Sequence, residues 1–470
     1  MKYSPMPIKV KPYAHQRDAY KRALEMFLSG KSRGYGLLFE CGCGKTITAI
    51  AVACQLYLTQ EVHRVLILAP LSILSVWKDE FEKFAGIPYA LAILEGSGAK
   101  KTDTLRRLRS NVLTVAVVNY ESAWRLESEL LAWKPDMIIA DEAHRLKTHN
   151  SKQSKACHRL SAAAKYRLIL TGTLVTNHAE DVFSPYKFLN PAIFGNSYYA
   201  FRNRFFDTYG YGNHQYRLKK SMEPEYTKKL HSIAYRIKKE DALDLPDTTD
   251  IIRRVTLEPN AAKLYAALVK ECYAELENGE ISVTNVLTKI LRLSQLTGGF
   301  ITDDDGKSSA VSNAKLDCLS DLLETLREEN KKAVVIAKFT AEINAIKAML
   351  EKAGVLYSAV TGETKDRAEQ TRRFQQETEV SVFIGQIACA SVGLTLHAAS
   401  DLIFYSLDYS TANHEQARSR IHRAGQTRFC SYYYIQARGT IDEKVLRSLK
   451  EKSDFARRVT DEYKRGVNPF

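Results

Sequence analysis

The chain has 470 residues, of which 45% are hydrophobic and 26% are charged, the balance of a folded globular protein rather than of a disordered one. This length indicates two or three domains. Lys and Arg number 68 against 54 Asp and Glu, and the net charge of +14 favours a polyanionic partner, of which nucleic acid is the commonest.

The chain shows no sign of a membrane segment or a secretion signal. No stretch approaches the roughly 18 apolar residues that a membrane helix needs, and the N-terminus lacks the apolar core of a signal peptide. We therefore expect an intracellular protein, cytoplasmic or nucleoid-associated, or located in the host cytoplasm if the source is viral. The eight cysteines include no C-x-x-C pair, so they predict neither a zinc ribbon nor a redox motif and are interpreted as reduced.

A glycine-rich string, Gly42-Cys43-Gly44-Lys45-Thr46, follows a strand-like run at 35–39 and opens a helical stretch at 47–58. Glycines allow backbone N–H groups to surround phosphates at a helix N-terminus, where the helix dipole favours anions. The pattern therefore predicts a phosphate loop (residues 42–46) that binds ATP, with Lys45 on the β- and γ-phosphates and Thr46 on Mg²⁺. A glycine-rich turn without a ligand is the alternative.

Short β-branched runs alternate with amphipathic stretches along most of the chain, which indicates parallel sheets covered by helices. This alternation of strand-like and helical segments is lost between about 190 and 312, so we expect an α/β protein of two lobes. The predicted parts are lobe 1 (1–240, with a helical protrusion at about 180–235), a junction with a helical insertion (241–312), and lobe 2 with a C-terminal brace helix (313–470). The expected strands are 65–68, 113–118, 137–139, 167–170, 333–336, 382–384 and 402–405.

Asp141 and Glu142 directly follow the strand-like run 137–140. Ligands of parallel sheets bind at the carboxyl ends of the strands. Asp141 is therefore predicted to hold Mg²⁺, and Glu142 to orient or deprotonate the attacking water. A solvated acidic loop is the alternative, but the phosphate loop about a hundred residues upstream favours hydrolysis of a nucleoside triphosphate.

Three arginines, Arg418, Arg420 and Arg423, lie close together near the C-terminus. An arginine finger neutralises the charge that builds on the γ-phosphate. A basic helix that faces solvent or nucleic acid is the alternative that these residues leave open.

Together with several further strings, these motifs resemble superfamily-two helicases, and most closely the Swi/Snf family of DNA translocases. The resemblance runs from about residue 12 to 450 and implies two RecA-like lobes of a P-loop NTPase. Departures from the family pattern are Phe39, Leu174 and Thr395, none of which removes a charged catalytic group. The further strings are 69–81, 118–122, 170–173 with 177, 236–238 with 245–246, 391–400 and 422–426.

The resemblance also implies roles for single residues. Gln16 corresponds to the glutamine that recognises adenine. Arg420 and Arg423 correspond to the arginine-finger positions, and Gln416 to the first residue of the motif that contains them. Because little chain lies outside the motifs, we expect a minimal member of the family, bacterial or viral, or a subunit that relies on partners. Expected contacts to the nucleic-acid backbone are Ser72, Asn119, Thr173, Lys338, Thr361 with Gly362, and Thr395.

The segment 201–219 interleaves aromatic and basic residues, as nucleic-acid surfaces often do. We favour the other interpretation, in which these aromatics pack into a small core.

The sequence as a whole predicts an ATP- and Mg²⁺-dependent motor on double-stranded DNA that does not separate the strands. A strand-separating DNA or RNA helicase is the alternative among enzymes, and a nucleic-acid-binding scaffold without hydrolysis is the alternative from another class. Protein partners are left open.

Overall fold

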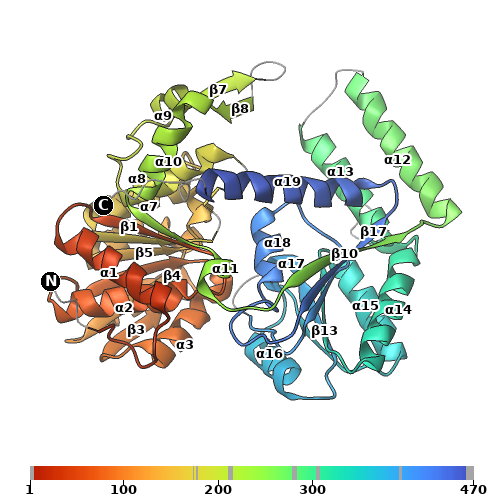
Figure 1. Cartoon of the computed structure of the whole chain (residues 1–470), viewed down its shortest axis with the longest axis horizontal. Helices are drawn as coiled ribbons and strands as arrows, with labels where there is room; N and C mark the ends of the chain where they lie inside the picture. Colours follow the sequence, from red (N-terminus) through yellow and green to blue (C-terminus); the bar gives the residue numbers. More distant parts are fainter. Residues whose placement is uncertain are drawn as a thin grey trace. The chain divides into compact units, whose positions relative to one another are not determined.

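The computed structural model describes residues 5–461, apart from 173, 176–177, 210–214, 278–282, 303–306 and 391–393 (Figure 1). The chain forms two compact units. The first comprises Met1–Asp244 together with the segment from Lys452 onward, and the second comprises Leu245–Glu451. The predicted junction, 241–312, therefore lies almost entirely within the second unit, and the three-part division stays a prediction.

The first unit is built on a parallel sheet of seven strands, in the order β3-β4-β2-β5-β6-β1-β9. Its inner strands β2, β4 and β5 are nearly continuous runs of buried apolar residues, because helices cover both faces of the sheet (Figure 1). The strands are β1 (Gly34–Phe39), β2 (Arg64–Ala69), β3 (Tyr89–Ile93), β4 (Leu113–Asn119), β5 (Met137–Asp141), β6 (Tyr166–Leu170) and β9 (Ala234–Ile237).

The helices of the first unit connect these strands or follow them in the chain. They are α1 (Ala14–Leu28), α2 (Lys45–Leu58), α3 (Leu74–Phe84), α4 (Gly98–Arg107), α5 (Tyr120–Ala123), α6 (Glu127–Trp133), α7 (Lys152–Ala163), α8 (Phe183–Leu189), α9 (Tyr198–Phe205), α10 (Glu223–His231) and α11 (Lys239–Ala242).

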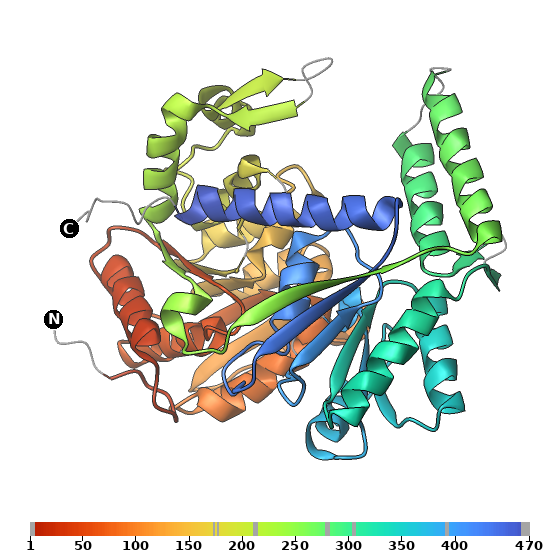
Figure 2. The same cartoon turned by 45° about the vertical axis from the view of Figure 1, so that its right-hand side comes forward.

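The protrusion at about 180–235 was expected to be helical, and this expectation is only partly right. Between α9 and α10 the chain forms an antiparallel pair of strands, β7 (Phe206–Tyr209) and β8 (Gln215–Leu218) (Figure 2). Phe201, Phe205 and Phe206 are buried in the main core of this unit, so these three aromatics pack as interpreted, whereas Tyr209 is exposed.

The second unit is built on a parallel sheet of six strands, in the order β10-β17-β16-β13-β15-β14. Consecutive side chains of β13 alternate between two hydrophobic clusters, with Val334 and Ile336 in one and Val335 in the other, so both faces are covered. The strands are β10 (Thr248–Val255), β13 (Ala333–Ala337), β14 (Tyr357–Val360), β15 (Val382–Gln386), β16 (Asp401–Phe404) and β17 (Cys430–Ala437), with a separate pair β11 (Phe300–Thr302) and β12 (Ser308–Ala310).

The predicted C-terminal helix, which Figure 2 shows as one uninterrupted helix, α19, begins in the second unit, although its part from Lys452 onward belongs to the first. The helices that lie or begin in the second unit include the predicted insertion. They are α12 (Pro259–Glu277), α13 (Val283–Thr297), α14 (Ala314–Glu328), α15 (Thr340–Lys352), α16 (Arg367–Gln376), α17 (Ile387–Ala390), α18 (Thr411–Arg418) and α19 (Ile441–Asp461).

All strands expected from the sequence are present, and both lobes are α/β with parallel sheets. Among the described helices, none is long and apolar enough to cross a membrane. The seven cysteines whose side chains the structure describes are all free thiols.

Candidate nucleotide-binding site

The phosphate loop connects a buried strand to a helix, as its sequence predicts. β1 is buried along its whole length, and α2 begins at Lys45, within the last two residues of the loop. Gly42 and Gly44 have φ angles of 91° and 81°, in the left-handed region that favours glycine. A Cβ atom at Gly44 would also overlap the Gln16 side chain, which would have to move away from the loop.

Helix α1 places two polar side chains against the phosphate loop. Gln16 donates from Nε2 to the carbonyl oxygen of Cys43 at 3.4 Å and accepts from the backbone N–H of Tyr13 at 3.0 Å. His15 Nε2 lies 2.8 Å from the same Cys43 oxygen. The predicted adenine-reading residue is therefore next to the loop, and its role stays a prediction.

Lys45 lies at the start of α2 and donates from Nζ to the carbonyl oxygen of Phe39 at 3.1 Å. Burial lowers the pKa of Lys45, but the acidic groups of Cys41 and Glu142 outweigh burial, so the pKa lies above its ordinary value. The side chain therefore presents a permanent positive charge where the loop is predicted to receive phosphates.

Asp141 and Glu142 lie at the carboxyl end of β5. In the sheet, β6 lies between β5 and β1, the strand that leads into the phosphate loop. Leu170 of β6 is in register with both Leu37 of β1 and Asp141 of β5, so the three strands end side by side. The motifs that the sequence separates by about a hundred residues therefore share one edge of the sheet, as parallel strands require.

The Asp141 carboxyl group is buried and held from two sides. Trp77 of α3 donates from Nε1 to Oδ2 at 3.1 Å, and the backbone N–H of Glu142 donates to Oδ1 at 2.9 Å. The hydroxyl of Tyr120 donates to the Asp141 carbonyl oxygen at 2.7 Å. Burial, with the charge of Glu142 beside it, raises the pKa of Asp141 to about 7. Trp77 and Tyr120 were not given this role by the sequence, because hydrogen bonds across 64 and 21 residues leave no local pattern.

The residues predicted to hold Mg²⁺ have suitable chemistry. Thr46 and Asp141 offer hydroxyl and carboxylate oxygens, the donors that Mg²⁺ prefers. A dication beside a buried carboxyl group favours its charged form, which burial alone disfavours. These two residues therefore fit the ion, which would neutralise charge on the phosphates.

The predicted nucleic-acid contacts of the first unit follow the same edge of the sheet. Ser72 lies in a single 3-10 turn, Leu71–Ile73, after β2. Asn119 is the last residue of β4 and donates from Nδ2 to Glu121 Oε2 at 2.9 Å. Thr173 lies outside the described residues.

The predicted nucleic-acid contacts of the second unit also follow the ends of strands. One residue that the sequence did not single out connects two of these contact segments. Lys338 follows β13, and Thr361 follows β14. Gln386, at the end of β15, accepts from the backbone N–H of Gly362 at 3.1 Å and donates to the Lys338 carbonyl oxygen at 3.4 Å. Its position at a strand end was the only signal that the sequence offered.

The predicted finger arginines bind carbonyl groups of their own unit. Arg420 is buried and donates to the carbonyl oxygens of Gln416 and Leu394, each at 3.0 Å. Arg423 donates to the same Leu394 oxygen at 3.1 Å and to the Thr395 hydroxyl at 2.8 Å. Two finger positions and one predicted nucleic-acid contact are thus joined within one small network.

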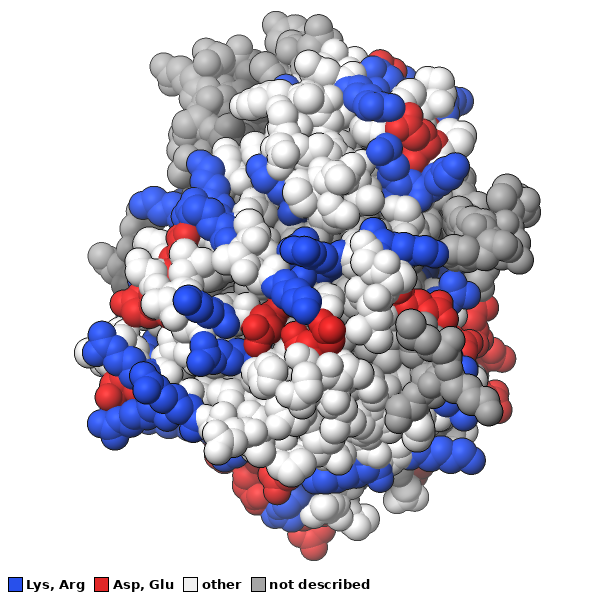
Figure 3. Space-filling view, turned by 90° about the vertical axis from the view of Figure 1, so that its left-hand side faces the viewer, with Lys and Arg blue, Asp and Glu red and all other residues white. Residues whose placement is uncertain are grey.

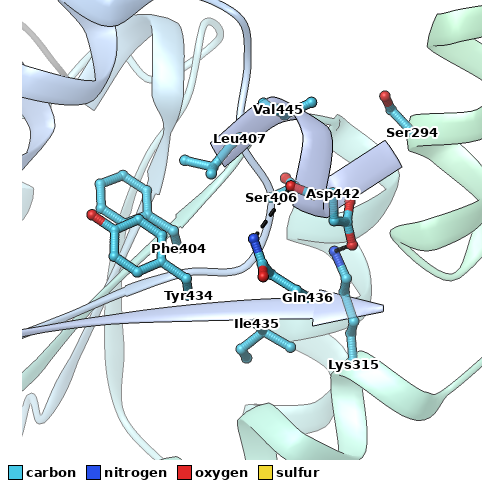
Figure 4. Close-up of a pocket in the computed structure, with 10 residues that line it drawn as sticks. All are labelled: Ser294, Lys315, Phe404, Ser406, Leu407, Tyr434, Ile435, Gln436, Asp442 and Val445. Atoms are coloured by element: carbon cyan, nitrogen blue, oxygen red, sulfur yellow. Dashed lines mark hydrogen bonds and ion pairs between the residues drawn. The ribbon is translucent and has the colours of Figure 1, made fainter. Parts of the chain in front are cut away.

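A small pocket in the second unit contains a buried ion pair that belongs to no predicted motif. Figure 4 shows Lys315 and Asp442 pointing toward each other, with Lys315 Nζ 2.6 Å from Asp442 Oδ2. Lys315 is almost completely buried. The pocket is lined by Ser294, Lys315, Phe404, Ser406, Leu407, Tyr434, Ile435, Gln436, Asp442 and Val445.

The chain is similar to known protein families and to single proteins. The model of the SNF2-related domain matches residues 13–298, and that of the helicase conserved C-terminal domain matches residues 314–425. The DNA repair and recombination protein RDH54 of Saccharomyces cerevisiae is 28% identical over 94% of this chain and 53% of its own length. CHROMATIN REMODELING 4 of Arabidopsis thaliana is 27% identical over 94% of this chain and 21% of its own length.

A bacterial relative is the uncharacterized ATP-dependent helicase MG018 of Mycoplasma genitalium, 25% identical over 95% of this chain and 42% of its own length. The chain spans about half the length of these curated relatives, or less. Among solved structures, the SWI2/SNF2 ATPase core of Sulfolobus solfataricus in complex with double-stranded DNA is 23% identical, with a TM-score of 0.47 over 98% of this chain and 96% of that chain.

Proposed function

Because the chain belongs to the SNF2-related family and carries its ATPase core, we propose that it is an ATP- and Mg²⁺-dependent motor that moves along double-stranded DNA without separating the strands. Its work would be to remodel DNA or complexes of protein with DNA. The observation that carries this proposal is the set of Lys45, Asp141 and Glu142 at one edge of the first sheet, with predicted nucleic-acid contacts along the same edge.

Each residue of the site has a definite task in this proposal. Lys45 and the N–H groups at the start of α2 bind the phosphates, and Gln16 selects adenine. Glu142 holds the attacking water and accepts its proton. Arg420 and Arg423 stabilise the charge that develops on the γ-phosphate, an effect of roughly 10³–10⁵ in rate for such arginines.

DNA is favoured over RNA as the track by the relatives, two of which are named for DNA repair and for chromatin remodelling. The net charge of +14 suits a polyanion, and basic side chains are spread widely over the face in Figure 3. Contacts through hydroxyls, amides and lysines are independent of base sequence, as a moving protein needs.

The decisive comparison is ATP turnover measured with duplex DNA, single-stranded DNA and RNA. We expect duplex DNA to stimulate turnover most, the protein to displace the third strand of a triplex in an ATP-dependent manner, and a forked duplex to stay paired. Separation of the fork, with stimulation by single strands only, would instead identify the helicase alternative. Absence of turnover with every nucleic acid would identify the scaffold alternative.

A further inference from the structure

The strongest unassigned feature is a partly buried ion pair at the base of the phosphate loop. Glu40 directly follows β1 and precedes the loop by one residue, and Arg236 lies in β9, the strand that pairs with β1. Arg236 Nη2 lies 3.1 Å from Glu40 Oε1. The two residues are 196 positions apart in the chain, and the Arg236 side chain is only 13% exposed.

The same guanidinium group joins two further segments of the site. Arg236 Nη1 donates to the Gly172 carbonyl oxygen at 3.0 Å and to the Leu38 carbonyl oxygen at 3.3 Å. Gly172 belongs to the turn after β6 and packs so closely that an added Cβ would lie 3.1 Å from the Phe39 carbonyl oxygen. One side chain thus fixes the end of β1, the start of the phosphate loop and the neighbouring turn.

Glu40 completes the connection from the other side. Its Oε2 accepts the backbone N–H of Lys239 at 3.0 Å, and its own N–H donates to the Ile237 carbonyl oxygen at 3.0 Å. Its carbonyl oxygen accepts the backbone N–H of Cys43, inside the loop, at 3.2 Å. Glu40 therefore bonds on one side to the loop and on the other to the segment that leaves the first unit at Asp244.

The position of Lys45 depends on the same residues. Its ammonium group donates to the carbonyl oxygen of Phe39, which directly precedes Glu40. A shift of the Phe39–Glu40 peptide would move both the acceptor of Lys45 and the first turn of the loop. An arginine fork is well suited to prevent such a shift because it holds several acceptors in fixed directions.

We propose that Arg236 and Glu40 are positioning residues of the ATPase, which hold the phosphate loop in its binding geometry and tie it to the chain that leads to the second unit. The inference rests on the proposed function, since it takes the loop to bind ATP. Neither residue touches the nucleotide in this assignment, and both act through the backbone of the loop.

The test is the affinity for a fluorescent ATP analogue, together with KM and kcat, in Arg236→Ala, Arg236→Lys and Glu40→Gln variants of the full chain. We expect KM and the dissociation constant to rise roughly tenfold or more in Arg236→Ala, with a smaller change in kcat. Arg236→Lys keeps the charge but not the fork, so rescue should be partial. The double variant Glu40→Gln with Arg236→Ala should be no worse than Arg236→Ala alone.

Arg204→Ala is the matched control, because Arg204 forms an ion pair with Glu225 at 2.8 Å on the surface of the protrusion. It should leave KM unchanged. Thermal melting of each variant separates positioning from folding. A variant that melts at a lower temperature yet keeps the wild-type KM would overturn the proposal, as would an unchanged KM in a Glu40→Gln variant of normal stability. A wild-type protein that binds no nucleotide would instead overturn the proposed function.

Discussion

Glu142 has an unusual backbone for the residue that is proposed to hold the attacking water. Its φ angle is 50°, in the left-handed region that residues other than glycine seldom adopt. The hydrogen bonds around Asp141 hold this conformation, and His144 Nδ1 lies 3.3 Å from Glu142 Oε2. Strain of this kind persists only where the surroundings impose it, and it commonly marks functional sites.

Replacing Glu142 with Gln tests its role in catalysis. The amide keeps the shape of the side chain but accepts no proton, so we expect turnover to fall by about 10²-fold or more while ATP binding is retained. The measurements are steady-state ATPase rate and nucleotide affinity. Glu225→Gln, at a carboxylate of the same unit that pairs with Arg204, serves as the control. Turnover near the wild-type rate in Glu142→Gln would refute the assignment.

Glu342 of α15 makes the stability of the protein depend on pH. Its carboxyl group accepts from the backbone N–H groups of Lys338 and Phe339, each at 3.0 Å, yet burial raises its pKa to about 7. Between the ordinary pKa of 4.5 and this value, the folded protein keeps a proton that the unfolded chain has released. Stability must therefore fall as the pH rises through this window, by about 3 kcal/mol at most.

Glu342→Gln removes the titrating group and should remove that part of the pH dependence. We expect the melting temperature of the wild type to fall from pH 5 to pH 7 relative to that of the variant, and to run parallel to it above pH 8. Parallel curves across the whole range would show that Glu342 titrates normally.

At the scale of elements, the start of α19 is held by a cluster around Asp442. Asp442 accepts from the Thr297 hydroxyl at 2.9 Å and from the Ala437 N–H at 3.0 Å, besides its ion pair with Lys315. The backbone N–H of Ile441 donates to the Tyr265 hydroxyl at 2.7 Å. Contacts from α12, α13, α14 and β17 thus converge on the first turn of this helix.

Asp442→Ala should destabilise the second unit strongly, because it removes the carboxylate that is paired directly with the buried Lys315 ammonium. Breaking a buried pair in this way costs about 3–5 kcal/mol. Chemical denaturation, monitored by circular dichroism, measures the change in the free energy of unfolding. Glu443→Ala is the control, since Glu443 lies 3.9 Å from Arg254 in a far more exposed pair. Equal effects of the two variants would contradict the argument.

The buried inner strands were predictable because their apolar runs depend on nothing else in the chain. β3, β9, β10 and β14 were missed, and all four lie at sheet edges. An edge strand has one paired side, and β10 in particular exposes most of its residues, so it lacks an apolar run. β17 was missed for another reason: its apolar run is interrupted by tyrosines, which are buried with their hydroxyl groups bonded. Tyr432 donates to the Arg418 carbonyl oxygen and Tyr434 bonds to Arg418, both at α18, whereas Tyr433 bonds to Asp401 of β16.

In the site, the charged groups of the motifs were predictable, and the residues that support them were not. Lys45, Asp141 and Glu142 follow strand ends in recognisable strings. Arg236 and Glu40, in contrast, meet only through the pairing of β9 with β1, which no local pattern reveals. Supporting residues are therefore found by tertiary structure rather than by motif.

At the scale of the whole molecule, the charge of +14 predicts how binding to DNA responds to salt. Each phosphate neutralised by Lys or Arg releases counterions, so affinity should fall steeply, by roughly 10³-fold between 50 and 200 mM salt. Fluorescence anisotropy with duplexes of unrelated sequence measures this, and their affinities should agree within a few fold. A weak dependence on salt, or a strong preference for one sequence, would contradict backbone binding.

The pairing of β10 with β17 also has a consequence during synthesis on the ribosome. The first sheet is complete once β9 has emerged, since all its strands lie between Gly34 and Ile237. β10 follows directly, but its partner begins only at Cys430. At a synthesis rate of about 5–20 residues per second, β10 is made roughly 10–35 s before β17. Its exposed arginines, Arg253 and Arg254, are the kind of residue that keeps a waiting strand from pairing with other chains.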